Sequence, residues 1–355
     1  MLLLLACAGP GSKSDDSAVP ADDTAGDDTG TVSDPLTLAD ADASVVGAAQ
    51  DGAGSALTGL GDTDGDGVDD LAVAAFYGNR VCTWSGPVVG THTMDDGVCL
   101  TGEATYDFFG YAVAGLGDLD GDGLGELAVG AVGSDDAGTE GGEVYLFKGP
   151  LSADPTASLI GEAAGDFLGG MVAGAGDLDG DGVSEWLVAA TGNDAQGGGG
   201  GRAYLVSGLP TGLDGRVVDV ASATFTGVGS SSGLMHGSTT GGDALGEAMA
   251  IVGDVDGDGL SDLLLGGSGS DAGGADAGIA WLVLAPFSGA YLAADADTRF
   301  IGPGPSAYVG GAVAGPGDLD GDGLADLAIT ADGWEEGRVY LQKAPPSGEI
   351  GRAHV

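Results

Sequence analysis

The chain has 355 residues and a formal net charge of −46, from 55 Asp and Glu against nine Lys and Arg. This charge repels phosphate backbones and anionic membrane surfaces, so nucleic acid is not an expected partner. The 74 glycines and 13 prolines fall at fixed offsets between short apolar runs, which is typical of many strands and turns and not of low-complexity sequence.

Residues 1–7 resemble a short lipoprotein signal. Four leucines, Ala6 and Cys7 follow Met1, but the basic start and the longer apolar core of a secretory signal are missing. Leu4-Leu5-Ala6-Cys7 resembles the lipobox of bacterial lipoproteins, in which the cysteine is lipidated. We expect a truncated or misassigned signal with lipidation at Cys7, chance similarity being the alternative. No later run reaches the length of a membrane-spanning helix.

Residues 8–40 are rich in Asp, Ser, Thr, Gly and Pro and contain almost no large apolar side chains. Such a segment cannot bury enough surface to offset the entropy of ordering it. We expect an acidic, disordered linker that tethers a folded body at 41–344 to a membrane anchor; the alternative is a tail without a role. Residues 345–355 are expected to be a C-terminal tail.

The folded body is a repeat array. The stretch GDLDGDGLGELAVGA, Gly117 to Ala131, occurs five times with local changes, and the first acids of the copies are 56, 59, 77 and 64 residues apart. Each unit holds short apolar or alternating segments bounded by Gly, Pro or Asp. In the second unit they are residues 109–114, 127–131, 144–147 and 157–161. Four short strands per unit predict a propeller blade or a β-meander.

The ends of the array suggest how it closes. The fifth unit ends after its third segment, Val339 to Leu341, and lacks a clear fourth, whereas Ser44-Val45-Val46-Gly47 precedes the first unit and looks like a fourth strand. We therefore predict an all-β fold, a β-propeller of five four-stranded blades closed by the N-terminal strand, which removes exposed sheet edges. The alternative is an incomplete seven-bladed propeller.

Every repeated loop places carboxylates at positions 1, 3, 5 and 9. They are Asp62, Asp64, Asp66 and Asp70; Asp118, Asp120, Asp122 and Glu126; Asp177, Asp179, Asp181 and Glu185; Asp254, Asp256, Asp258 and Asp262; and Asp318, Asp320, Asp322 and Asp326. Glycine at position 6 permits the sharp turn that gathers these oxygens. Position 7 would add a backbone carbonyl. The residues at that position are Val68, Leu124, Val183, Leu260 and Leu324.

Hard oxygen donors of this number suit Ca²⁺ better than Mg²⁺, and the absence of His and Cys from the loops argues against zinc. The alternative is a metal-free Asp/Gly turn, but four crowded carboxylates repel one another unless a cation lies among them. We therefore predict about five Ca²⁺ ions. An EF-hand is excluded because position 12 is Val, Leu or Ile instead of Glu. Dockerin and thrombospondin type-3 loops lie much closer together than these.

Phe-Gly at Phe109-Gly110, the acidic loop, the strand Val129-Gly130-Ala131 and Val144-Tyr145-Leu146-Phe147 together resemble the FG-GAP repeats of the integrin alpha subunit β-propeller. The resemblance implies calcium loops between the first and second strands of each blade, on the face opposite the usual ligand surface. This chain departs from the family in having five recognisable units instead of seven. The Phe survives only at Phe109; the other units have Ala53, Leu168, Leu245 and Val309.

Cys82 and Cys99 fall on the third and fourth predicted strands of the first unit, so they could face each other across a hairpin. A disulfide is plausible in an exported protein, and two buried thiols are the alternative. Catalysis is not expected: Gly229-Ser230-Ser231-Ser232-Gly233 matches the nucleophile-elbow string with His236 nearby, but it lacks the strand and helix that the elbow needs. His92 and His354 fall in no metal-ligand spacing.

The leading functional hypothesis is an extracytoplasmic, monomeric, calcium-binding propeller that binds a protein or glycan at the surface of a cell. The expected lipidation at Cys7 would make it part of a bacterial envelope. Two alternatives remain: a purely structural surface repeat, and a propeller accessory to a polysaccharide- or lipid-acting enzyme. Candidate ligand positions are the insertion from Gly227 to Asp243, Tyr77 and Trp334, which strand counting places opposite the acidic loops. A tolerated surface insertion is the simpler alternative.

Overall fold

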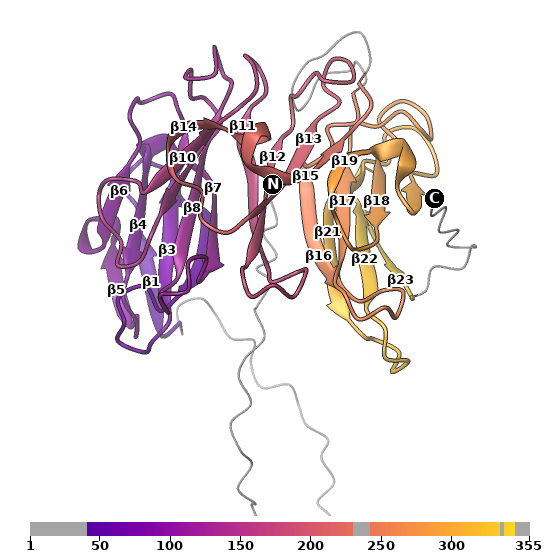
Figure 1. Ribbon diagram of the computed structural model, residues 1–355. Coiled ribbons are helices and arrows are strands. Elements are labelled where there is room, and N and C mark those ends of the chain that lie inside the picture. The colour runs from indigo at the N-terminus through magenta and orange to yellow at the C-terminus, as the bar shows by residue number, and fades with distance from the viewer. Residues whose placement is uncertain (1–40, 230–241, 334–336, 345–355) are drawn as a thin grey trace, which may run out of the picture.

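The computed structural model describes residues 41–229, 242–333 and 337–344, and almost all of its ordered elements are strands (Figure 1). The predicted signal with Cys7, the linker at 8–40 and the tail at 345–355 lie outside these residues. The few helical turns are short: α1 (Val217–Val220) and the 3-10 turns η2 (Phe76–Gly78), η3 (Met94–Asp96) and η4 (Ala293–Asp295). Within the described ranges, no helix has the length and apolar character needed to cross a membrane.

The predicted four-strand units are present, and we number them 1 to 5 in chain order. The first strands are β2 (Ala53–Gly61), β7 (Phe109–Gly117), β11 (Leu168–Gly176), β16 (Ala248–Gly253) and β21 (Val309–Gly317). The second strands are β3 (Asp70–Ala75), β8 (Glu126–Ala131), β12 (Glu185–Ala190), β17 (Asp262–Gly267) and β22 (Asp326–Ala331). The third strands are β4 (Arg80–Trp84), β9 (Glu143–Phe147), β13 (Arg202–Ser207), β18 (Ile279–Val283) and β23 (Arg338–Gln342).

Units 1 to 4 each add a fourth strand, which completes an antiparallel sheet in the order first, second, third, fourth. These strands are β6 (Val98–Thr101), β10 (Ala157–Ile160), β15 (Ala221–Thr226) and β20 (Thr298–Ile301). In the described part of unit 5 the sheet has three strands. The all-β fold of repeated, blade-like sheets is therefore confirmed, because short β-prone runs separated by Gly, Pro and Asp form the strands that their spacing predicts.

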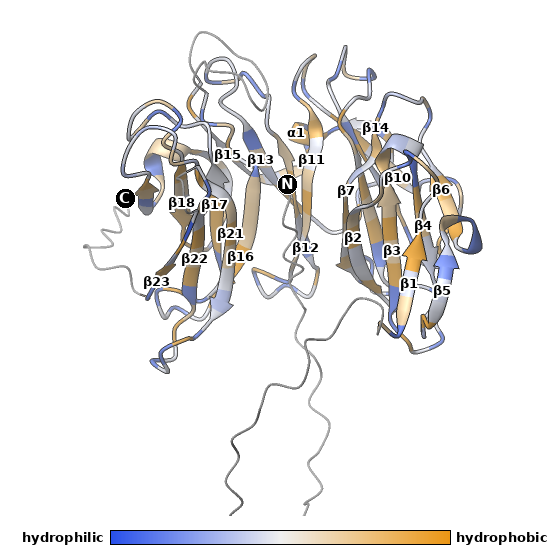
Figure 2. Cartoon of the chain, turned by 180° about the vertical axis from the view of Figure 1, so that it is seen from behind, coloured by the Kyte–Doolittle hydropathy of each residue, from blue (hydrophilic) through white to orange (hydrophobic). Residues whose placement is uncertain are grey.

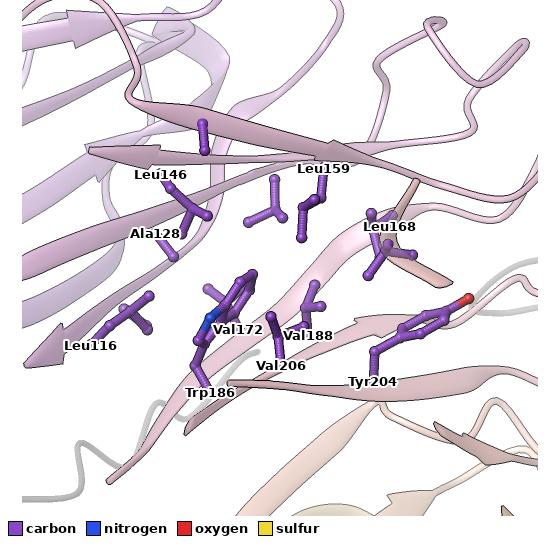
Figure 3. Close-up of a cluster of buried hydrophobic side chains, with 14 of the residues drawn as sticks. Leu116, Ala128, Leu146, Leu159, Leu168, Val172, Trp186, Val188, Tyr204 and Val206 are labelled. Carbon is purple, nitrogen blue, oxygen red and sulfur yellow. The ribbon is translucent and has the colours of Figure 1, made fainter. Parts of the chain in front are cut away.

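The hydrophobic core lies between consecutive units. Second strands are apolar on both faces, so alternate side chains pack on the unit before and the unit after. On β12, Trp186 and Val188 pack against unit 2, whereas Leu187 and Ala189 pack against unit 4. Figure 3 shows the first of these interfaces, with Leu146 and Leu159 of unit 2 facing the side chains of unit 3. Each blade is thus stabilised by its neighbours.

A glycine at the start of each first strand permits this close stacking. Gly169 has a φ of +88°, and a Cβ atom there would lie 2.6 Å from the carbonyl oxygen of Glu143 in the preceding unit. Any larger residue would push the two blades apart, in addition to the strain of a left-handed backbone. Close contacts of this kind explain the glycine eight residues before the first acid in units 2 to 5, whereas at Gly54 a Cβ atom would meet nothing within 4 Å and the left-handed φ of +82° alone favours glycine.

Three further strands, which the sequence analysis did not predict, lie between the third and fourth strands of their units: β5 (Gly90–Thr93), β14 (Gly212–Arg216) and β19 (Gly289–Leu292). Two of them pair in parallel with the fourth strand of the preceding unit, β14 with β10 and β19 with β15. They are short and mostly exposed, so they carry little hydrophobic periodicity. The strands β14 and β19 therefore join neighbouring blades by backbone hydrogen bonds.

The predicted closure by the N-terminal strand is wrong. β1 (Ala43–Val46) pairs in parallel with β5, from Ala43 opposite Gly90 to Val46 opposite Thr93. It lies on β5 as β10 lies on β14, in the place of a preceding unit's fourth strand. In the part of the chain that the structure describes, β23 pairs only with β22. Figures 1 and 2 show units 1 and 5 on opposite sides of the molecule with unit 3 between them.

The outer face of unit 5 shows the consequence. Val339 and Leu341 are 64% and 63% exposed, whereas Ala280 and Leu282, at the same positions of unit 4, are fully buried against unit 5. The five units therefore form an array with an uncovered apolar face at its C-terminal end. Figure 2 shows that the strands are mainly apolar and that the loops at the ends of the blades are mainly polar.

Cys82 on β4 and Cys99 on β6 are cross-strand partners joined by a disulfide, with their Cα atoms 4.0 Å apart. The bond ties the hairpin of unit 1 beside the buried Trp84 and Met94. It spans 17 residues.

We predict that reduction of this disulfide lowers the free energy of unfolding by about 3 kcal/mol, because the unfolded chain loses a loop constraint of this length. Urea unfolding with and without reductant measures the loss. The double variant C82A/C99A should be insensitive to reductant. Peptide mapping that recovers Cys82 and Cys99 as free thiols from the unreduced protein would contradict the pairing.

Candidate functional site

The five acidic loops, numbered with their units, connect the first strand of each unit to the second. Since the strands are antiparallel, all five loops lie at the same end of the blades; loop 5, between β21 and β22, is at the lower right of Figure 1. Glycine at position 6 has a φ between 83° and 92° in every loop. This left-handed turn brings the carboxylates of one loop to a common point.

The carboxylate at position 1 organises each turn by accepting backbone hydrogen bonds. In loop 1, Gly65 N–H donates to Asp62 Oδ1 at 2.7 Å and Gly67 N–H donates to Asp62 Oδ2 at 2.8 Å. The same two bonds form in the other four loops. These N–H groups favour the charged form, so the Gly67 amide lowers the pKa of Asp62 and the Gly323 amide lowers that of Asp318.

Position 5 repeats this arrangement one step further along the loop. Its carboxylate accepts the backbone N–H of position 7 at 2.8 or 2.9 Å in all five loops, as Asp66 does from Val68. That bond fixes the peptide of position 7, whose carbonyl is a predicted metal ligand. The oxygens of positions 1, 3 and 5 lie within 4.8 Å of one another in loops 1 and 2.

Position 9 is the first residue of each second strand, and its side chain is buried in all five units. One carboxylate oxygen accepts the N–H of position 2, at 2.8 Å between Leu178 N and Glu185 Oε2. Burial raises the pKa of Glu126 to about 7 and that of Asp262 to about 6. In loops 3 and 4 the position-9 oxygens also lie within 4.8 Å of those of positions 1 and 3.

Loop 2 contains an unpaired buried oxygen. Glu126 Oε2 accepts from Leu119 N–H, but Oε1 has no hydrogen-bond partner among the described residues and is shielded from solvent. An orphaned buried carboxylate oxygen is costly. Asp118, Asp120 and Asp122 lie close enough to raise the pKa of Glu126 further. Together these oxygens fit a hard divalent cation, which positions 1, 3, 5 and 9 and the position-7 carbonyl would hold.

A second repeated carboxylate, at the opposite end of the blades, was not identified from the sequence. An Asp lies three residues before the repeat glycine in units 1 to 4: Asp51, Asp107, Asp166 and Asp243. Asp166 Oδ2 accepts from the backbone N–H groups of Glu162 and Ala163 at 2.9 Å and from Asn193 Nδ2 at 3.1 Å. These contacts assign a structural role to this Asp, which holds the loops of that face. The constant spacing of three residues between this Asp and the repeat glycine is the sequence pattern from which it could have been identified.

An aromatic cluster lies on that same face, where units 1 and 2 meet. The Phe76 ring centroid is 4.1 Å from that of Tyr77, 6.1 Å from that of Phe108 and 5.8 Å from that of Tyr111. Tyr77 is 63% exposed, and Tyr106 in the neighbouring loop is 79% exposed. Tyr77 is one of the predicted ligand positions.

The other candidates are placed as follows. Trp334, Ser230 to Gly233 and His236 lie outside the described residues, as does His354. The described ends of the insertion, at 227–229 and 242–243, are held by backbone bonds such as Asp243 N to the Val228 carbonyl at 3.1 Å. His92 lies on β5, where its Nε2 is 2.8 Å from the Val89 carbonyl.

The FG-GAP repeat family model matches residues 109–147 and 310–341, in units 2 and 5. Integrin alpha-5 of Xenopus laevis is 32% identical over 150 residues, which is 38% of this chain and 14% of that protein. Human integrin alpha-IIb is 37% identical over 86 residues (23% and 8%), and chicken integrin alpha-V is 38% identical over 93 residues (24% and 9%). This chain thus spans less than a sixth of each relative.

The chain therefore contains FG-GAP repeats of the type found in the N-terminal propeller of integrin alpha subunits, as predicted from its motifs. A solved structure, titled "Crystal structure of BBS1N in complex with ARL6DN, soaked with lead", covers 83% of this chain and 80% of its own. Its identity is 12% and its TM-score is 0.37, a likeness too distant to carry an argument.

We predict that the rise in melting temperature caused by calcium shrinks as the pH falls from 7.5 to 5. In the metal-free fold the raised pKa values of Glu126 and Asp262 mean that protons bind there more tightly than in the unfolded chain. That proton-linked stability is present at low pH and lost as the pH rises toward 7. Calcium needs the ionised carboxylates, so protons compete with it.

Melting curves of resin-stripped protein, with and without 1 mM calcium at both pH values, measure this effect. In the variant E126Q/D262N, the metal-free protein should lose part of its pH dependence in this range, and the remainder comes from other buried carboxyls such as Glu143, whose pKa burial raises to about 7. A calcium shift of equal size at pH 5 and pH 7.5 would speak against buried carboxylates as ligands.

Proposed function

We propose that this chain is a calcium-stabilised propeller module that acts outside the cytoplasm and binds a protein or glycan through the face opposite its acidic loops. The observation that carries the proposal is the identical hydrogen-bonding scheme of the five loops at one end of the blades. Backbone groups position the carboxylates but leave their mutual repulsion unbalanced, and a divalent cation balances it.

Calcium in this scheme is structural. Position 9 begins the second strand, which is largely buried in every blade, while positions 1 to 5 follow the first strand. An ion held by both ends of the loop ties the first strand to the second. It also neutralises part of the charge of the 55 acidic residues.

The opposite face is the proposed binding surface. Tyr77, which stacks on the half-buried Phe76, and Tyr106 lie there on short connections, and exposed aromatic side chains of this kind are enriched in recognition surfaces. The disulfide between Cys82 and Cys99 and the lipobox-like Cys7 favour an exported protein, because disulfides persist in oxidising compartments. Its similarity to integrin alpha subunits favours a surface or adhesion role.

We predict that removing calcium lowers the melting temperature by about 10 °C or more. With a dissociation constant near 10⁻⁴ M, about 1 mM calcium contributes roughly 1.4 kcal/mol per site, or about 7 kcal/mol for five sites in the additive limit. That amount is comparable with the whole stability of a domain, about 5 to 15 kcal/mol. Circular dichroism melting in calcium and in excess EDTA measures the change, with magnesium as the control cation. Superimposable curves would refute the calcium role.

We predict that glycan and envelope-protein arrays probed in calcium give reproducible hits, and that Y77A/Y106A weakens binding by about ten-fold or more. These substitutions remove exposed rings that support no core contact. V89A, which truncates an exposed side chain in the connection between β4 and β5, is the matched control. An absence of hits across broad arrays would favour the alternative, a purely structural surface repeat.

A further inference from the structure

The two ends of the array have sheet edges that complement each other. At the N-terminal end, β1 forms a two-stranded sheet with β5, and among the described residues it has no other strand partner. At the C-terminal end, β23 pairs only with β22 in the described part of unit 5. If β1 is a fourth strand, one end has a fourth strand without a third beside it, and the other has a third strand without a fourth.

The pairing of β1 identifies it as a fourth strand. Ala43 lies opposite Gly90 in the parallel pair of β1 and β5, just as Ala157 lies opposite Gly212 in the pair of β10 and β14. In this alignment, the segment ASVVG at 43–47 matches ASLIG at 157–161. Therefore β1 corresponds to β10 residue by residue, although no unit precedes it in the described residues.

This correspondence fixes the register in which β1 would pair with β23. In units 1 to 4, the last residue of the fourth strand lies opposite the first residue of the third strand. The same register places the last residue of β1 opposite the first residue of β23. Val45 is then opposite Val339, and Ala43 is opposite Leu341. Both of these pairs are apolar, as the interior of a blade interface requires.

The side chains at both ends match those of an interface between units. In unit 2 the pair that corresponds to Val45 and Val339 is Leu159 and Val144, and both of its members are buried against unit 3. Val45 already packs on the outer face of unit 1, beside Trp84. It contributes to unit 1 what Leu159 contributes to unit 3. The third strand that would lie beside it is missing from that end.

We propose that the C-terminal end of one copy of this chain docks on the N-terminal end of a second copy, so that β1 of the second copy becomes the fourth strand of unit 5 in the first. The occupant is a second copy because the contact continues an interface that the chain forms four times between its own consecutive units. One docking step covers both the free edge of β23 and the apolar face of unit 5.

The position of the two ends favours contact between chains over contact within one chain. Units 1 and 5 lie on opposite sides of the molecule with unit 3 between them (Figures 1 and 2). Because the two surfaces differ, association is head to tail and can continue from copy to copy. The inference goes beyond the proposed function and replaces the expected monomer. The charge of −46 on each copy opposes the contact, so salt should strengthen it.

Sedimentation equilibrium of the full chain in calcium and about 0.5 M salt measures the association. The average mass should rise above that of one chain as the protein concentration increases. V45D and L341D should each weaken self-association by about ten-fold or more, because each places a charge in the apolar contact. L213D is the matched control, since it places the same charge on a 59% exposed leucine of β14 in unit 3. Melting curves check that each variant is folded.

Mixing the two variants tests the direction of the contact. V45D keeps an intact β23, and L341D keeps an intact β1. An equimolar mixture should therefore form a dimer that cannot grow, although each variant alone stays a monomer. Symmetric pairing of β23 with β23 would instead leave V45D associated on its own, and this result would overturn the inference.

Cysteine cross-linking tests the register without introducing charge. In a C7S background, a mixture of V45C and V339C chains should form an interchain disulfide under mild oxidation. V45C mixed with Y340C should not, because consecutive side chains of a strand point to opposite faces.

Two results would contradict the association itself. A wild-type chain that remains a monomer at every concentration is expected if residues 345–355 cover the apolar face of unit 5. A disulfide that forms within single V45C/V339C chains is expected if the array closes on itself. Either result would overturn the inference and leave the proposed calcium sites untouched.

Discussion

Crowding of carboxylates at the turn between the first and second strands is the constraint on which the rest of the structure depends. Each turn holds four acids, and the left-handed glycine and backbone N–H groups bring oxygens of three of them within 4.8 Å of one another in loops 1 to 4. Those amides satisfy one lone pair of most carboxylates, but they cannot cancel a local charge of four. The fold therefore concentrates an electrostatic cost at one face, which the proposed cation would offset.

That face is coupled to the core through position 9. Its carboxylate is buried because it begins the second strand, whose neighbouring residues, such as Leu127 and Trp186, fill both interfaces of the blade. Order in the loop and packing between blades are consequently coupled, because Glu126 and Asp262 are both loop residues and the first residues of second strands. Displacing either one would disturb the strand that packs between two blades. The opposite face carries no comparable acidic loop in the described residues, and it is the face to which we assign recognition in the proposed function.

Sequence reasoning predicted the parts of the fold that have a strong local signal. Apolar runs bounded by Gly and Pro gave the strands of each unit, and the Asp spacing gave the loops. The strands β5, β14 and β19 were not predicted because they are polar and exposed, and their pairing is to a different unit. The closure was predicted wrongly for the same reason: Ser44 to Val46 reads correctly as a strand, but its partner, Gly90 to Thr93, has no periodicity to reveal it. Lys148 shows a similar limit, since the sequence does not reveal that its amine pairs with Asp120 and Asp122.

The central claim is that the five loops are calcium sites with the ligands at positions 1, 3, 5, 7 and 9. Long-wavelength anomalous diffraction from crystals grown in calcium tests it most directly. The account predicts anomalous peaks in the loops, each about 2.3 to 2.6 Å from the carboxylate oxygens. Crystals grown in millimolar calcium that show no anomalous peak in any of the five loops would contradict it.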